Sequence, residues 1–233
     1  QFLASHTAEN GHLVTESGAP LTVGDVQRQI IRWSTERDLE NAEGMIFANG
    51  RDAGVPHSRG QKDAPLTLGE TIVFDYFPRE AGGGYFYDFT RTWCLGYAPA
   101  AVEQAHRQVV AAFELALANL RVGQSCRALQ RTVNDYFYEE GHRTTRSHPG
   151  TTEGYVHSLG HGVGLSIHEH PRLAETASPE ELVRAGMVLT IEPGLYYPED
   201  AYGIRVEDYI WMDPKTGHPQ TIGVFDKELV IPL

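Results

Sequence analysis

Five side chains in three segments of this sequence could together hold two divalent metal ions. They are Asp75 and Asp88 in TIVFDYFPREAGGGYFYDFTRTW, His161 in HSLGHGVGLSIHEHP, and Glu192 and Glu207 in VLTIEPGLYYPEDAYGIRVEDYIWM. Four carboxylates and one imidazole supply enough oxygen and nitrogen donors for two ions that share bridging carboxylates. Such a pair of ions binds and ionises a water molecule, which the hydrolysis of an unactivated amide near neutral pH requires.

Two of these carboxylates interrupt segments that are otherwise apolar. Asp75 stands in IVFDYF, and Glu192 stands in VLTIEPG. An unpaired carboxylate in a buried strand costs several kcal/mol, so each of the two needs a metal ion or a cationic partner. We expect metal ligation because the same anomaly occurs twice; the alternative for Asp75 is a salt bridge to Arg91.

The second carboxylate of each segment also lies among apolar and aromatic residues, Asp88 in YFYDFT and Glu207 in IRVEDYIW. Asp208 follows Glu207 directly, so strand alternation places the two on opposite faces. We expect Glu207 to be the ligand and Asp208 to lie at the surface or to support the ligands. Arg91 and Arg205 are expected to orient these carboxylates, and Arg205 is also a candidate for contact with the substrate.

The histidines suggest one more ligand and a set of polar groups beside it. His161 lies in GHGVG, where glycines let the backbone pack closely while the imidazole points inward. His168 could donate a hydrogen bond to a developing oxyanion, and His57 is a candidate for substrate contact. His157 and His161 have i, i+4 spacing, but the zinc motif HExxH is absent because Ser158 stands where that motif has Glu.

The elements that position these residues occur in two similar sets. VGDVQRQI (Val23–Ile30) resembles VGQSCRAL (Val122–Leu129), and LGETIVFD (Leu68–Asp75) resembles AGMVLTIE (Ala185–Glu192). In both copies of the second motif, a carboxylate follows the glycine by six residues. The sequence therefore predicts two α/β halves related by a pseudo-twofold axis, with their carboxylates converging at the interface, where binding sites commonly form.

Local patterns place the individual helices and strands. Apolar spacing predicts helices near Val23–Asp38, Pro99–Arg121 and Ser125–Glu140. Strands are predicted at Thr71–Phe77, Tyr85–Cys94, Val188–Glu192 and Ile204–Met212. The glycines of Gly82–Gly84 are expected to turn a hairpin that carries Asp75 outward and Asp88 back.

Bulk properties exclude several classes of protein. The 233 residues carry a net charge of −12, which argues against nucleic-acid and membrane partners. No apolar run approaches the roughly 18 residues that a spanning helix needs. Cys94 and Cys126 form neither a disulfide framework nor a thiolate metal site, and we interpret them as reduced thiols of a cytoplasmic protein. Six histidines, His106 and His142 among them, are expected at the surface.

With these residues placed, the chain resembles the catalytic domain of the pita-bread metallopeptidases, namely methionine aminopeptidase, prolidase and aminopeptidase P, from about Val23 to Val230. The resemblance implies an α+β fold of two related halves around a dinuclear metal site. It implies the ligand set Asp75, Asp88, His161, Glu192 and Glu207. It also implies that Glu192 doubles as a proton shuttle, that His168 stabilises the tetrahedral intermediate, and that His57 and His157 line the substrate pocket.

Within this family, EPGLY after Glu192 and GIRVED around Glu207 are similar to the Xaa-Pro enzymes. Two features depart from the family pattern. Asp75 and Asp88 are thirteen residues apart, which is longer than usual, and the extra length fits the glycine turn between them. The Xaa-Pro enzymes also usually carry an N-terminal domain that shapes the pocket and the dimer. We expect residues 1–233 to be the catalytic domain without it.

The resemblance implies an exopeptidase that hydrolyses the bond between an N-terminal residue and proline in a small peptide, through a hydroxide that bridges two metal ions. Mn or Co is expected, with Zn or Fe as alternatives, and a homodimer is possible. The alternatives for function are a methionine aminopeptidase, a metal-free amidinohydrolase of the creatinase type, and a non-catalytic peptide-binding or scaffold protein. Dipeptide or longer-peptide preference stays open, with Arg172 and Arg184 as candidates to bind a free substrate carboxylate.

Overall fold

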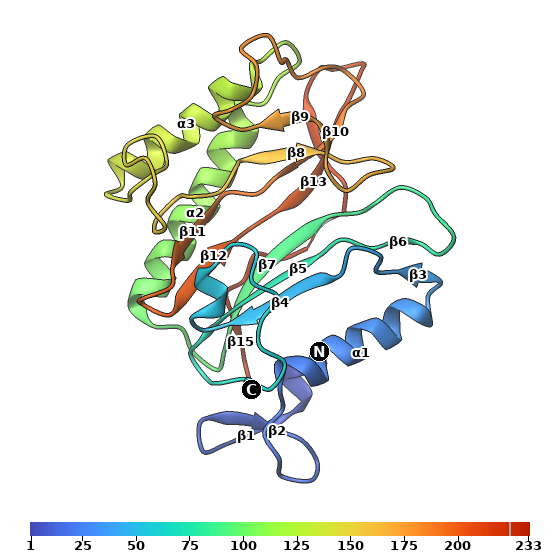
Figure 1. Cartoon of the computed structure of the whole chain (residues 1–233), viewed down its shortest axis with the longest axis vertical. Helices are drawn as coiled ribbons and strands as arrows, with labels where there is room; N and C mark the ends of the chain where they lie inside the picture. Colours follow the sequence, from blue (N-terminus) through green and yellow to red (C-terminus); the bar gives the residue numbers. More distant parts are fainter. Residues whose placement is uncertain (224) are drawn as a thin grey trace.

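The computed structural model describes residues 1–223 and 225–233. It is built around a four-stranded and a five-stranded sheet that lie side by side with helices on their outer faces (Figure 1), and three two-stranded sheets are added to them. The helices are α1 (Val23–Thr35), α2 (Ala100–Asn119) and α3 (Cys126–Glu139), with 3-10 turns η1 (Leu3–Ser5) and η2 (Asp52–Gly54). The strands are β1 (Thr7–Glu9), β2 (His12–Val14), β3 (Leu39–Glu40), β4 (Met45–Asn49), β5 (Thr71–Tyr76), β6 (Arg79–Glu80), β7 (Phe89–Leu95), β8 (Gly160–Gly162), β9 (Glu169–Leu173), β10 (Val188–Ile191), β11 (Gly194–Tyr197), β12 (Tyr202–Arg205), β13 (Asp208–Met212), β14 (Pro219–Thr221) and β15 (Val230–Ile231).

The three predicted helices are confirmed, and local chemistry explains where two of them begin. Thr22 and Asp25 form a reciprocal capping box at the start of α1, which satisfies two backbone N–H groups that a helix end leaves free. The Ser125 hydroxyl accepts from the Ala128 amide at the start of α3. Helix α1 buries Val26 and Ile30 against the first sheet, whereas α2 and α3 together cover the second.

The order of strands in the sheets confirms the predicted internal repeat. The first sheet runs β15-β7-β5-β4 and the second runs β14-β13-β10-β8-β9. In each half the strand that carries the repeated motif, β5 or β10, lies between two antiparallel neighbours. Asp75 lies within β5 and Glu192 directly follows β10, so the repeat delivers one carboxylate from each half to the interface.

Two predicted strands differ from those in the structure. Residues 85–88 precede the strand, which begins only at Phe89, and the stretch predicted as Ile204–Met212 is divided into β12 and β13. The division falls at Val206 and Glu207, because the Glu207 amide donates to the Thr90 carbonyl of the other half. The sequence reading also missed β4, the five-residue neighbour of β5, although MIFAN is a short apolar run after a glycine.

The two halves touch backbone to backbone beside the interface. A Cβ atom on Gly203 of β12 would lie 1.8 Å from the Ala53 carbonyl oxygen of η2, so only glycine fits at this position. Among the described residues, no helix has the length and apolar character needed to span a membrane. His106 and His142 are not surface residues as expected, since His106 is buried on α2 and His142 is hydrogen-bonded to Tyr197 and Gln108.

Candidate metal centre

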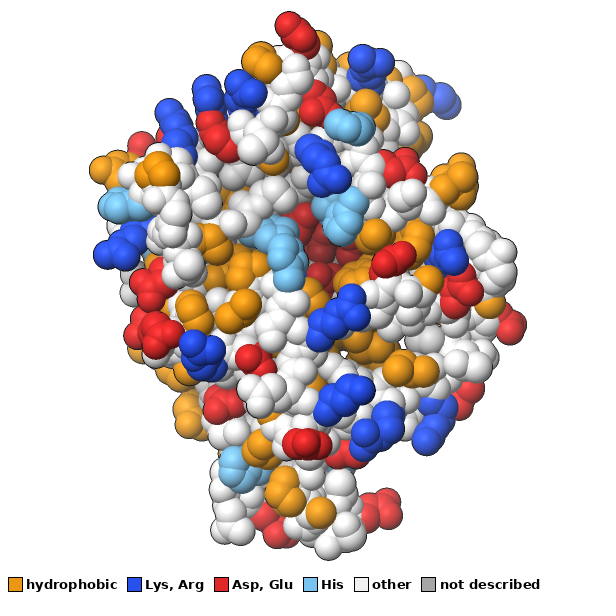
Figure 2. All heavy atoms as spheres, viewed as in Figure 1, with side chains coloured by type: hydrophobic (Ala, Val, Ile, Leu, Met, Phe, Trp, Pro, Cys, Tyr) orange, Lys and Arg blue, Asp and Glu red, His pale blue; other side chains and the backbone are white. Residues whose placement is uncertain are grey.

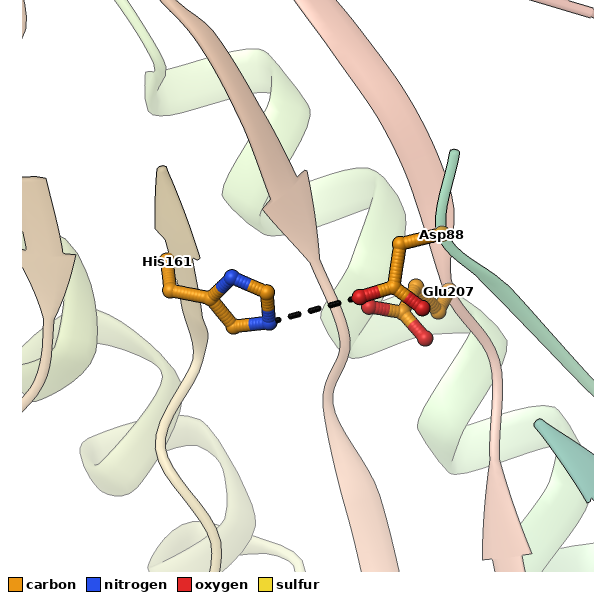
Figure 3. A group of neighbouring side chains, drawn as sticks. All are labelled: Asp88, His161 and Glu207. Carbon is orange, nitrogen blue, oxygen red and sulfur yellow. Dashed lines mark ion pairs between the residues drawn. The ribbon is translucent and has the colours of Figure 1, made fainter. Parts of the chain in front are cut away.

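Three of the predicted ligands converge at the interface between the halves (Figure 3). Asp88 lies just before β7, His161 lies in β8, and Glu207 occupies the break between β12 and β13. Each is buried, and each offers one donor atom within 4.8 Å of the donor atoms of the other two. The first half therefore contributes one of these ligands and the second half contributes two.

His161 is held in the tautomer that a metal ligand requires. Its Nδ1 lies 3.1 Å from the carbonyl oxygen of Gly162, so Nδ1 carries the proton and donates it. Its Nε2 faces the carboxylates of Asp88 and Glu192 at 3.5 and 3.4 Å. Burial lowers the pKa of His161 to about 4, so the ring is neutral and Nε2 presents a lone pair. A histidine that binds a metal through one ring nitrogen commonly donates the N–H of its other ring nitrogen to a carbonyl oxygen, as His161 does here.

Several carboxylate oxygens are buried without a partner among the described residues. Oδ1 of Asp75, Oδ1 of Asp88 and Oε1 of Glu207 accept no hydrogen bond, although each is shielded from solvent. The other oxygen of Glu207 accepts a 2.6 Å hydrogen bond from the Thr90 hydroxyl. Buried polar atoms are rarely left unpaired, so this arrangement fits a bound cation.

The carboxylates also repel one another. Burial, followed by the charges of Glu207, Asp75 and Glu192, raises the pKa of Asp88 well above its usual value. Burial, followed by the charges of Glu207 and Asp75, likewise raises the pKa of Glu192. The pKa of Glu207 rises to about 8, through burial and the charge of Asp75. Divalent ions would remove this repulsion, and a set of oxygen donors with one imidazole suits Mn, Fe, Co or Zn. The residues present therefore fit the expected ions.

Asp75 lies beside the three converging ligands and has a cationic partner. That partner is Arg205, whose Nη2 lies 2.6 Å from Oδ2 of Asp75, and not Arg91 as the alternative predicted. The guanidinium of Arg205 also donates to Tyr196 Oη and to the Pro56 carbonyl. Arg205 is 1% exposed and donates to Asp75, as the orienting role predicts, and its contact with substrate stays a prediction.

Histidines surround the opening to these carboxylates. On the face drawn in Figure 2, histidine side chains flank acidic atoms at the floor of a central hollow. Nε2 of His57 lies 3.0 Å from Nε2 of His157, whose Nδ1 lies 3.0 Å from the Ser158 carbonyl. His157 therefore donates through Nδ1 and accepts from His57. The His168 ring lies 4.4 Å from the His161 ring, centroid to centroid. Burial lowers the pKa of His57, His157 and His168, so all three are neutral near pH 7.

Sequence reasoning missed some of the residues that support the ligands. Thr90 and Tyr196 gave no signal of their own, because a hydroxyl within an aromatic strand is ordinary. Asp208 was placed at the surface or in a supporting position. The surface alternative is wrong, since Asp208 is 6% exposed and pairs with Arg91 and Lys227.

Comparison with known proteins finds metallopeptidases. The profile of metallopeptidase family M24 matches residues 22–214. An uncharacterized peptidase of Methanocaldococcus jannaschii is 32% identical over 181 residues, covering 77% of this chain and 47% of that protein. The Xaa-Pro dipeptidase of Pyrococcus furiosus is 31% identical over 165 residues, covering 71% of this chain and 43% of the dipeptidase.

A solved structure shows the same fold. The crystal structure of the prolidase from Pyrococcus horikoshii superposes with a TM-score of 0.78 at 26% identity, covering 93% of this chain and 57% of the prolidase. The expected pita-bread fold is thereby confirmed. The chain spans about half the length of these relatives.

Proposed function

Because the chain belongs to metallopeptidase family M24, we propose that it binds two divalent ions between its halves and hydrolyses the bond between an N-terminal residue and proline. The observation that carries this proposal is the convergence of Asp88, His161 and Glu207, with the bare Nε2 of His161 and unpaired buried oxygens facing one another. Asp75 and Glu192 complete the proposed ligand set.

The ions, when bound, would polarise the scissile carbonyl group and lower the pKa of a water molecule. The residues of the chain would then move protons and hold the substrate. Glu192 is suited to take a proton from water and pass it to the departing proline nitrogen, because its raised pKa favours the protonated intermediate state. The neutral N–H of His168, at the open side of His161, is suited to donate to the developing oxyanion.

The remaining histidines suit the recognition of the peptide. His57 is exposed, and its hydrogen bond to His157 leaves its Nδ1 available to a ligand. His157 contacts the Glu192 carboxylate at 3.3 Å, so a substrate that touches this pair lies against the proposed proton carrier. We therefore assign substrate binding to His57 and His157.

Arg172 supports a preference for dipeptides. It pairs in register with His161 across β8 and β9, and residues directly opposite in antiparallel strands point to the same face. Its charge lowers the pKa of both His161 and His168, and its exposed guanidinium makes no ion pair within the described residues. The other candidate, Arg184, lines a separate small pocket with His170. We therefore propose that Arg172 holds the free carboxylate of the proline residue in a dipeptide.

The proposal is tested by metal reconstitution. The chain is stripped with chelator and assayed with Gly-Pro, Gly-Pro-amide, Ala-Pro-Pro and Met-Ala-Ser after Mn or Co is returned. Release of the residue before proline, abolished by Glu192→Gln, would support the assignment. Arg172→Met should lower the rate with Gly-Pro and leave the amide unaffected.

Other results would identify the rivals. Cleavage of only the methionine peptide would indicate a methionine aminopeptidase. Metal binding without turnover of any peptide would favour a non-catalytic peptide-binding role for these residues. A cytoplasmic location, expected from the cysteines, stays a prediction; Cys94 and Cys126 are free and buried.

A further inference from the structure

We propose that the C-terminal segment Phe225–Lys227 belongs to the metal centre, with Lys227 acting as a positioning residue for Glu207 through Asp208 and Arg91. This inference rests on the proposed metal-dependent function. It concerns residues that lie behind the ligands and that no step proposed above uses.

Arg91 is the centre of this arrangement. Its guanidinium is 1% exposed and uses all five of its N–H groups. Two of them, on Nη1, donate to the carbonyls of Thr90 and Glu207 at 2.9 and 2.7 Å. Nη2 donates to the Asp208 carboxylate at 2.5 Å and to the Phe225 carbonyl at 2.7 Å, and Nε donates to the Asp226 carbonyl at 3.0 Å. One buried cation therefore joins the C-terminal segment to the backbone of a proposed ligand.

Glu207 depends on these contacts because it lies outside regular structure. It stands between β12 and β13, so it has no continuous ladder on either side. Its amide donates to Thr90, its carbonyl accepts from Arg91, and one carboxylate oxygen accepts from the Thr90 hydroxyl. The direction of the free oxygen Oε1 is consequently set by β7 and by Arg91 together.

Lys227 is the second cationic partner of Asp208, beside Arg91. Its Nζ lies 2.7 Å from Oδ2 of Asp208, the oxygen opposite to the one that Arg91 holds. The same ammonium lies 4.5 Å from the centre of the Phe113 ring on α2, a distance typical of a cation–π contact. Lys227 thus fixes Asp208 from a second direction and ties the segment to α2, so that Arg91 cannot turn away from Glu207.

An ordinary structural ion pair is the alternative, and the two readings differ in what a substitution changes. If Lys227 only stabilises the fold, its removal lowers the melting temperature and leaves metal affinity intact. If it positions Glu207, metal affinity falls. Residues that orient metal ligands from behind typically change affinity by about tenfold to a hundredfold when substituted.

The experiment is calorimetric titration of chelator-stripped protein with Mn²⁺, together with its melting temperature, for wild type, Lys227→Met and Lys227→Arg. We expect Lys227→Met to weaken one of the two Mn²⁺ binding steps by about tenfold or more. Lys227→Arg should keep the affinity of this step close to that of wild type, because a cavity of about 510 Å³ beside Lys227 leaves room for the larger head group. Arg131→Met is the matched control, since Arg131 of α3 forms its ion pair with Glu175, away from the ligands, and this variant should leave both steps unchanged.

The other outcomes show whether the positioning role fails alone or together with the proposed function. Unchanged Mn²⁺ affinity in Lys227→Met, with or without a lower melting temperature, would overturn the positioning role and leave the metal site standing. Absence of Mn²⁺ binding by the wild-type chain would overturn both. Should Lys227→Met fail to fold, Lys227→Gln tests the same loss of charge with a side chain that can still donate to Asp208.

Discussion

Removing the metal should make the stability of this protein depend strongly on pH. Burial and the charge of Asp75 raise the pKa of Glu207 from 4.5 to about 8. A carboxyl group whose pKa is higher in the folded chain binds its proton more tightly when folded. Its stabilising contribution is therefore complete below about pH 4.5 and is lost as the pH rises towards 8.

The magnitude follows from the size of this pKa change. Each pKa unit corresponds to about 1.4 kcal/mol, so between about pH 6.5 and pH 8.5, where the histidines no longer titrate, Glu207 alone would cost the metal-free protein about 2 kcal/mol. The raised pKa values of Asp88 and Glu192 act in the same direction. For a chain of this length, a loss of about 2 kcal/mol lowers the melting temperature by roughly 4–8 °C.

The assay is thermal unfolding between pH 4.5 and pH 8.5, with chelator or with excess Mn²⁺. Below about pH 6.5 the lowered pKa values of the buried histidines, such as that of His161, increase stability as the pH rises and so oppose Glu207. We therefore expect the melting temperature of the chelated protein to fall between about pH 6.5 and pH 8.5, and that of the Mn²⁺-loaded protein to change much less. Glu207→Gln removes the titrating group, so the chelated variant should be more stable than the chelated wild type above pH 7. A chelated wild type whose stability does not fall between about pH 6.5 and pH 8.5 would refute the reasoning, because the carboxylates could not then be as crowded as the structure shows.

Three further predictions concern single side chains. Thr90→Val removes the hydroxyl that donates to Glu207 and should weaken Mn²⁺ binding about tenfold in calorimetry; an unchanged affinity would show that this hydrogen bond does not orient the ligand. Thr22→Ala breaks the capping box of α1 and should cost about 1 kcal/mol in urea unfolding, whereas Mn²⁺ affinity should stay that of wild type. Phe113→Ala opens a cavity in the core at a side chain that is 1% exposed and should cost about 3–5 kcal/mol in the same assay, and a loss below 1 kcal/mol would contradict the packing described for α2.

The sequence predicted those features that depend on nearby residues. Helical spacing located α1, α2 and α3, and the repeated glycine motif located β5 and β10. The carboxylates at Asp75 and Glu192 were recognisable because a charge within an apolar strand is costly and therefore needs a reason.

Features that depend on contacts between the halves could not be predicted in this way. The break before Glu207 exists because its amide bonds to Thr90, which is 117 residues away in the sequence. Both residues carry local patterns that suit a continuous strand. The same limit explains why the alternative partner named for Asp75 is Arg91 and not Arg205, since alternation along one strand gives no information about the strand that faces it.

The way the proposed ligands are divided between the halves has a consequence for assembly. Asp88 belongs to the first half and His161 and Glu207 to the second, so neither half can form the site alone. Binding of the ions would therefore add its free energy to the docking of the two halves. A chain cut in the connection around the exposed Tyr97 should yield fragments that reassociate more tightly in Mn²⁺ than in chelator, with the ions serving as a removable cross-link.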